Sequence, residues 1–451
     1  MAVTKPTCDE SAEDLLERLL LEETAVQPRD GVALCLSGGG YRAMLFHLGS
    51  IIRLNQIGVL SQLSRVSSVS GGSILAALLG LRWKDLKFDS RGYASNLDSL
   101  IVEPIRQLAS ITIDRPAIFW GFLLPGETGE VLAKKYRRIF GDATLQDLPC
   151  DSDSPTFVFN STSVQYGSRV CISSNYILQI PYDLGVIFSK ETQMARIGQA
   201  FASLEAGMIY RPNLSLAMAV AASSAFPPFL SPIEIPIDPN QWVTRRVDDK
   251  LGQAAAVKMA SKLYLTDGGV YDNLGVESAL RHHKTLLVSD GGGQKENQVH
   301  PKRNWVGHTI RVLDLIDQLG RKRIKENLLR SYSGGAGGNV RNGTYWSIWS
   351  NIENFYKVEN DLRVGAFSEE NAAIQRDVES KFRSAARVEY TRQLAATSTR
   401  LKKIDQTKQE RLINWGYVIC ETAMRRHSLE LIEANTCPAE FPYAVGIGQE
   451  I

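Results

Sequence analysis

One pattern recurs four times in this chain and restricts the folds it can adopt: a short apolar run ends in serine or aspartate followed by glycines. It occurs in GVALCLSGGG from residue 31, RVSSVSGG from residue 65, KLYLTDGG from residue 262 and TLLVSDGGG from residue 285. Helix-like sequences follow the first two runs, over residues 41–52 and 73–81. Strands that alternate with helices predict an α/β fold, in which helices cover both faces of a parallel sheet.

Residues 30–300 carry this pattern, and we expect them to form one α/β domain. Residues 1–29 read as an acidic amphipathic helix without the basic start and apolar run of a signal peptide. Residues 301–451 are charged and helix-like, most clearly over 311–332 and 368–427. They predict a helical extension packed on the core through one apolar face formed by Leu401, Ile404, Leu412, Trp415 and Ile419.

Charge and cysteine content narrow the function classes. A net charge of +2 argues against broad electrostatic binding to nucleic acid. The six cysteines are scattered without a C-x-x-C pair, which indicates reduced residues of a cytoplasmic protein. No zinc motif appears, and we expect no metal or other cofactor. No run approaches the roughly 20 apolar residues of a membrane span, so we expect any membrane contact to be peripheral.

Three consecutive glycines, Gly38, Gly39 and Gly40, stand between a predicted strand and a predicted helix. Such a loop exposes backbone N–H groups to an anion, which is either a phosphate or a developing oxyanion. The spacing to Ala43 also matches the dinucleotide fingerprint G-x-G-x-x-A, which expects an acidic residue about 20 positions later. No Asp or Glu occurs between residues 31 and 84, which disfavours a nucleotide site.

The second glycine turn resembles a nucleophile elbow. The stretch Ser68-Val69-Ser70-Gly71-Gly72 fits G-x-S-x-G except at its first position. Ser70 then occupies the turn and Gly71 begins the helix, whereas Ser67 and Ser68 belong to the strand and Ser73 to the helix. The pattern therefore favours Ser70 as the nucleophile. A serine that merely caps the helix is the alternative.

A serine nucleophile needs a group that takes its proton. His282 and His283 precede a strand, which puts them at the sheet edge opposite to the usual site of parallel sheets. We expect them to have a surface role, or a charge role near the C-terminus of a helix. His47 falls in an apolar helix and is expected to be a core residue. Asp267 and Asp290 both follow strands, and spacing alone does not choose between them.

Taken in order, the strand with GGG-x-R, the strand with S-x-S-G-G and the strand with D-G-G resemble the patatin-like phospholipase family. The resemblance covers roughly Gly31 to Gly293. That family uses a Ser–Asp dyad without histidine. Its loop D-G-G-G-x-R-G is similar to residues 37–43, where Ser and Ala replace the outer Asp and Gly. Its D-G-[GA] motif is similar to residues 267–269 and favours Asp267 over Asp290. The stretch AASSAFPPFLSPI, residues 221–233, resembles the family's Ala-Ser, Pro-rich segment and is expected to shape the wall of the site.

The resemblance implies a three-layer patatin-like fold with a central, mostly parallel sheet, and a lipid acyl hydrolase. Asp267 would accept the proton of Ser70, which attacks a lipid ester. The amides of Gly38, Gly39 and Gly40 would form the oxyanion hole. Arg42 would hold the loop or attract a lipid phosphate, with Gly71 supporting the turn.

The implied substrate is a (phospho)lipid at a membrane surface, with the helical extension open to an activator or a second copy of the chain. Residues 116–126 and 344–356, the latter with Trp346 and Trp349, are candidate lids or interfacial anchors; a buried cap is the alternative. A non-catalytic membrane-binding scaffold on the same fold is the competing function.

Overall fold

The structure is a computed structural model of the 451-residue chain. It describes residues 10–23, 28–113, 128–150, 153, 155–180, 207–227, 230–238, 241–244, 261–294, 298–300, 304–333, 340–356, 380–434 and 436–448. Residues 116–126, a candidate lid or interfacial anchor, lie outside these residues.

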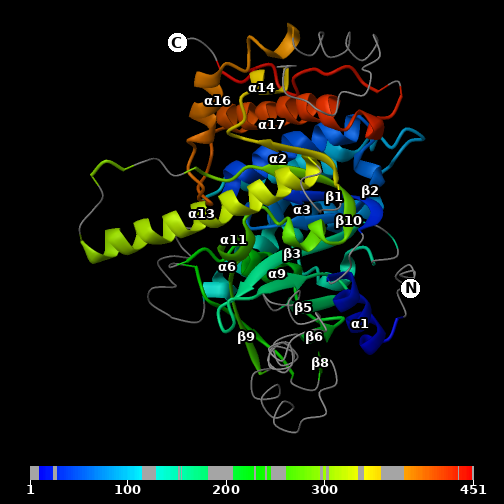
Figure 1. Ribbon diagram of the computed structural model, residues 1–451, viewed down its shortest axis with the longest axis vertical. Coiled ribbons are helices and arrows are strands. Elements are labelled where there is room, and N and C mark those ends of the chain that lie inside the picture. Colours follow the sequence, from blue (N-terminus) through cyan, green and yellow to red (C-terminus); the bar gives the residue numbers. More distant parts are fainter. Residues whose placement is uncertain are drawn as a thin grey trace.

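An 11-stranded mixed sheet forms the centre of the molecule (Figure 1). Strands β11-β10-β1-β2-β3 run parallel, and the remaining pairings, β3-β4-β5-β6-β8 and β3-β9-β7, are antiparallel. The strands are β1 (Arg29–Leu36), β2 (Leu63–Ser68), β3 (Thr156–Ser163), β4 (Arg169–Ile172), β5 (Tyr176–Ile180), β6 (Gly207–Tyr210), β7 (Ile233–Pro236), β8 (Trp242–Thr244), β9 (Lys262–Asp267), β10 (His283–Asp290) and β11 (Asn342–Ser347).

Helices lie on both faces of this sheet, as the sequence pattern predicts. They are α1 (Ala12–Glu23), α2 (Gly40–Gln56), α3 (Gly71–Arg82), α4 (Glu103–Ala109), α6 (Thr128–Phe140), α9 (Leu216–Ser223), α11 (Gly269–Asp272), α12 (Glu277–Leu280), α13 (Trp305–Ser333), α14 (Glu353–Tyr356), α16 (Val388–Ala395) and α17 (Gln406–His427). The expected α/β class, with helices flanking a sheet and further helices at the C-terminus, is confirmed.

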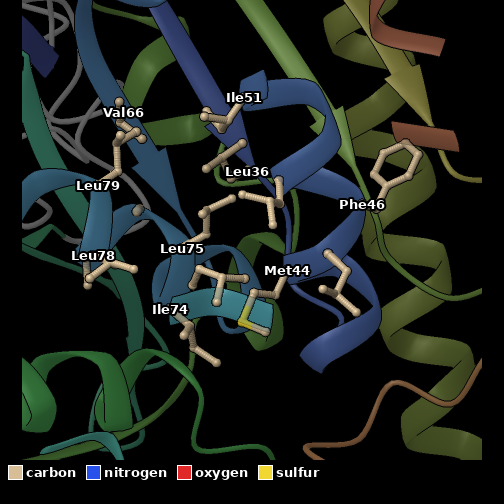
Figure 2. Packing of buried hydrophobic residues seen from close by; sticks show 14 of the residues in the cluster. Leu36, Met44, Phe46, Ile51, Val66, Ile74, Leu75, Leu78 and Leu79 are labelled. Carbon is tan, nitrogen blue, oxygen red and sulfur yellow. The ribbon is translucent and has the colours of Figure 1, made fainter. Parts of the chain in front are cut away.

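Alternation along β1 shows how the two faces are filled. Leu34 and Leu36 join the main core with α2, α3 and α17, and Figure 2 shows Leu36 beside Met44 of α2 and Leu75 of α3. Ala33 and Cys35 point to the other face and pack in a cluster with α12 and α13. A third cluster holds α1 against the antiparallel strands through its leucines. Both faces of the parallel strands are therefore buried, which explains their continuous apolar sequence.

The residues after 300 are part of the same core. Strand β11 extends the sheet beside β10, although the sequence predicted helices alone in this region. Helix α17 lies along α2 (Figure 1), and a Cβ atom on Gly416 or Gly49 would collide with the backbone of the opposite helix. The helical prediction over 368–427 is wrong for residues 396–405, since α17 begins only after Asp405, whose side chain caps it by accepting from Lys408 N–H.

Leu401 and Ile404 are buried as expected but lie in the segment before α17.

One cysteine differs from the expectation of reduced thiols. Cys150 is disulfide-bonded, whereas Cys35, Cys171, Cys420 and Cys437 are free. The scattered spacing gave no indication of a pairing, because spacing reports sequence separation and not proximity in the fold.

Candidate active site

Ser70 sits on a strained turn between β2 and α3. Its backbone has φ 52° and ψ −117°, a conformation that costs a non-glycine residue about 1–3 kcal/mol. Glycine is required on its C-terminal side, because a Cβ on Gly71 would collide with the carbonyl of Gly40, and one on Gly72 with the carbonyl of Leu36. These two glycines therefore let the start of α3 pack directly on the backbone of residues 36–40, with Ser70 at the turn before it.

Asp267 ends β9, a strand that runs antiparallel to β3. Its carboxylate accepts hydrogen bonds from the Ser70 side chain and from the N–H of Gly269, the latter at 2.7 Å. Burial raises the pKa of Asp267 to about 7, and the charge of Asp317 raises it further, whereas the two hydrogen bonds lower it. A carboxyl group with a pKa near neutrality is suited to taking and returning a proton.

The glycine loop lies beside this pair. A Cβ on Gly38 would lie 3.2 Å from the Cβ of Ser70. Gly39 and Gly40 have φ values of 145° and 60°, which favour glycine. The Gly38 N–H donates to the carbonyl of Asn273 at 3.0 Å, and within the described ranges no acceptor is found for the amides of Gly39 and Gly40. Two unengaged N–H groups at the start of α2 therefore lie near Ser70, where they are available to an anion.

Arg42 follows this loop in the first turn of α2. It is buried and donates to three backbone carbonyls: to Gly291 from Nε and Nη2, and to Ala395 and Thr397 from Nη1, at 2.7–3.2 Å. Burial and the charge of Arg321 lower its pKa to about 10, although Asp290 opposes the shift. These contacts match loop support, and they leave Arg42 directed at backbone carbonyls.

Asp290, the other candidate acid, is occupied elsewhere. It forms a buried ion pair with Arg321 and accepts hydrogen bonds from Tyr345 Oη at 2.6 Å and from the Gly292 N–H at 2.9 Å. Burial raises its pKa, but the positive charge of Arg321 and these hydrogen bonds outweigh burial and hold the pKa below its usual value. Asp290 is thus a fixed anion in a structural pair.

The histidines lie away from Ser70. His283 pairs with Arg29 at the start of β10, the opposite edge of the sheet, as the topology predicts. The expectation of a surface role is wrong, however, because His282 and His283 are both buried, and His282 contacts Glu22 and Glu23 at 3.0–3.2 Å. His47 is buried in α2, where burial lowers its pKa to about 4.

The tryptophans of residues 344–356 are packed into the protein. Trp346 is fully buried and donates its indole N–H to Ser50 Oγ at 2.9 Å. Trp349 is partly buried and donates to the carbonyl of Gly292 at 3.0 Å. These contacts hold both side chains against the body of the protein, which favours a buried cap over a lid or an interfacial anchor for this segment.

Three polar residues that the sequence did not single out support the site. Asn273, in the stretch VYDNLG, holds Gly38 through its carbonyl. Ser223 accepts a hydrogen bond from the Ser70 N–H and donates one to the carbonyl of Asn160. The side-chain amide of Asn160 donates in turn to the carbonyl of Ser68. Ser223 belongs to the stretch AASSAF, which the family resemblance predicts only as a wall of the site, and its two serines are the sequence signal for this residue.

Among the described residues, no cluster of three or more His, Cys, Asp or Glu is arranged to hold a metal ion. In the same part of the chain, no helix has the length and apolar character needed to cross a bilayer.

A search of curated proteins finds no match. Two structures of human GIVD cytosolic phospholipase A2, one with the inhibitor methyl gamma-linolenyl fluorophosphonate, are 15% and 13% identical, with TM-scores of 0.43 and 0.44. Each match covers 94% of this chain and 63% or 66% of the human chain. VipD from Legionella pneumophila is 12% identical over 86% of this chain and 83% of its own, with a TM-score of 0.26.

The family comparison is more specific. The family described as patatin-like phospholipase matches residues 34–280, which include the glycine loop, Ser70 and Asp267. This match covers more than half of the 451 residues. The chain belongs to the patatin-like phospholipase family.

Proposed function

We propose that this protein is a serine lipid acyl hydrolase that cleaves carboxylic esters of (phospho)lipids through Ser70 and Asp267. Membership of the patatin-like phospholipase family supports hydrolysis of lipid esters. The observation that carries the mechanism is the hydrogen bond between the side chain of Ser70, held on a strained turn, and a buried carboxylate whose pKa is about 7.

In the first half-reaction, Ser70 Oγ attacks the ester carbonyl while its proton passes to Asp267. The tetrahedral oxyanion lies against the loop of Gly38, Gly39 and Gly40. We assign the donated hydrogen bonds to the amides of Gly39 and Gly40, since that of Gly38 is engaged by Asn273. Each well-aimed donor lowers the barrier by about 3–4 kcal/mol in enzymes with such a hole.

The carbon–oxygen bond of the ester then breaks, and the leaving alcohol takes the proton from Asp267. Water attacks the acyl-enzyme, giving its proton to Asp267, and the second tetrahedral intermediate collapses to release the fatty acid and restore the proton to Ser70. Arg42 and Gly71 support the geometry of the site. Arg42 fixes the start of α2, directly after the glycine loop, and Gly71 allows that loop to lie close to the Ser70 turn.

Turnover of phospholipid vesicles and of a soluble short-chain ester tests this assignment in wild type, Ser70→Ala and Asp267→Ala. The exposed serine variant Ser99→Ala is the control. We expect both site variants to lose at least about 10³-fold in turnover and Ser99→Ala to match wild type. A fluorophosphonate should label wild type but not Ser70→Ala. Unchanged turnover in both site variants refutes the proposal, and absent labelling of wild type with intact vesicle binding favours the scaffold function.

We also propose that helix α13 brings the site to the lipid surface. Its inner side carries Arg321 and Tyr332, which contact β10, and Asp317, whose charge acts on Asp267. Its outer side carries apolar residues that are 38–61% exposed: Val312, Leu313, Leu315, Ile316 and Leu319. The N-terminal half of α13 reaches out from the body (Figure 1). An apolar patch on a protruding helix beside a lipid-hydrolysing site fits insertion between lipid head groups.

Vesicle binding of the Ser70→Ala protein, with and without Ile316→Asp and Leu319→Asp, tests this surface. The acidic substitutions should weaken binding to phospholipid vesicles by at least about 10-fold, because two apolar side chains are lost to the membrane. Turnover of a soluble short-chain ester in the Ser70-containing versions should stay unchanged. Equal vesicle binding of both proteins excludes this role of α13.

A further inference from the structure

Ser223 forms hydrogen bonds with Ser70 and with Gly268, the residue that follows Asp267. It is the last residue of α9 and is completely buried. Its Oγ accepts a hydrogen bond from the backbone N–H of Ser70 at 3.1 Å, and its carbonyl accepts from the N–H of Gly268, next to Asp267, at 3.3 Å. Two residues later, the carbonyl of Ala225 accepts from the N–H of Asp267 at 3.0 Å.

The direction of these hydrogen bonds follows from the available protons. Ser223 donates its single hydroxyl proton to the carbonyl of Asn160 at 2.7 Å, since a carbonyl oxygen can only accept. Ser68 likewise gives its proton to the carbonyl of Val158 at 3.1 Å. The hydroxyl of Ser73 lies 2.8 Å from Ser223 Oγ and 3.0 Å from Ser68 Oγ, and its single proton is donated to one of these two oxygens at a time. The Oγ of Ser223 therefore accepts the hydrogen bond from the Ser70 N–H, and its other lone pair faces Ser73.

The same network explains why serine stands at position 68, where the elbow pattern has glycine. Ser68 is completely buried in β2, and its hydroxyl contacts Val158 and Ser73 behind the turn. A side chain is tolerated there because its hydroxyl is accommodated in this polar cluster.

The strained backbone of Ser70 requires support. A residue at φ 52° and ψ −117° persists when surrounding contacts over-determine its conformation. The Ser70 N–H stands at the start of α3, where helix N–H groups have no acceptor within the helix. Ser223 Oγ supplies that acceptor from a different element, α9, which is itself tied to the strand end of Asp267.

We propose that Ser223 is a positioning residue that fixes the Ser70 turn and the Asp267 turn relative to one another. The proposal rests on the proposed function of Ser70 and Asp267. Ser223 acts through the Ser70 backbone and touches no reacting atom. Its loss leaves the buried N–H of Ser70 without an acceptor, which lets the turn relax and moves Oγ relative to the carboxylate. Displacements of about 1 Å in such sites cost roughly 10²-fold in rate.

Two variants of equal shape isolate the hydroxyl. Threonine and valine at position 223 have nearly the same volume, but only threonine keeps the acceptor. Ser73→Ala is the matched control, because it removes an equally buried hydroxyl of the same network without touching the Ser70 N–H. The measurements are kcat and KM on a soluble short-chain ester, the rate constant of fluorophosphonate labelling, and the melting temperature.

We expect Ser223→Val to lower kcat and the labelling rate constant together by about 10- to 100-fold relative to Ser223→Thr, with KM changed less than about twofold. Ser73→Ala should lower the melting temperature but keep kcat within about threefold of wild type. Equal kcat for the valine and threonine variants, or an equal loss in Ser73→Ala, overturns the role of Ser223. Full activity of Ser70→Ala instead overturns the proposed function itself.

Discussion

Replacing Asp267 by asparagine is expected to stabilise the fold while removing the proton acceptor of the proposed reaction. Burial raises the pKa of this carboxyl group from 3.8 to about 7 in the folded protein. Between these two values the unfolded chain is ionised while the folded protein binds a proton. The free energy of unfolding therefore falls as the pH rises from about 4 to 7, and the loss is complete above pH 7.

The shift from 3.8 to about 7 corresponds to about 4 kcal/mol of lost stability at high pH. Asparagine has the same shape, carries no charge and still accepts the Gly269 N–H bond. Asp267→Asn should therefore exceed wild type in unfolding free energy by about 4 kcal/mol at pH 8.5 and by about 2 kcal/mol at pH 5. Urea unfolding of both proteins at the two pH values measures this difference.

Asp290→Asn is the control with the opposite sign. Asp290 is equally buried, but its pKa is lowered against the opposing effect of burial by the charge of Arg321, so its neutralisation should destabilise the protein. In wild type, kcat/KM should rise with pH and level off above about pH 7, because the base must be ionised. An Asp267→Asn stability difference that does not grow between pH 5 and pH 8.5 refutes the assignment of a buried, proton-binding carboxyl group.

Further predictions concern the supports of the site. Gly71→Ala should lower the unfolding free energy by about 3 kcal/mol and abolish turnover, because the new methyl group meets the backbone of the glycine loop, whereas Gly320→Ala, in open space on α13, should stabilise by up to about 1 kcal/mol. Urea unfolding measures both. Arg42→Lys should lower kcat at least about 10-fold, because one ammonium group cannot reach the carbonyl of Gly291 and those of Ala395 and Thr397 together; steady-state kinetics on a soluble ester test it. Glu421→Gln should cost about 3 kcal/mol by leaving Arg53 buried without its carboxylate partner, and calorimetry should still show one transition because α17 shares the core of α2.

The sequence was most informative where backbone conformation demands a residue type. Glycines at positions 38–40 and 71–72 marked both turns, because positive φ values and close backbone approach exclude side chains. Periodic apolar runs identified β1, β2, α2 and α3 to within a few residues. These features are local, so a linear pattern is sufficient to reveal them.

The strand arrangement that brings Asp267 beside Ser70 differs from the one that the sequence predicts. The sequence placed it at the carboxyl edge of a parallel sheet, but β9 runs antiparallel to β3, with Asp267 opposite Ser161. It meets Ser70 because β3 continues beyond the end of β2 and carries β9 past the elbow. Strand direction depends on pairings between distant segments, which spacing does not record. The same holds for the ion pair that removes Asp290 from consideration, because its partner Arg321 lies 31 residues away.

The contact between the glycine loop and residues 395–400 has a consequence for the order of biosynthesis. Arg42 donates to Ala395 and Thr397, and the Tyr41 N–H donates to the carbonyl of Arg400 at 3.3 Å. A ribosome makes the loop early and these partners some 350 residues later. The nascent chain therefore emerges with Ser70 and Asp267 already present but with its anion site unbraced until nearly the last helix has been translated.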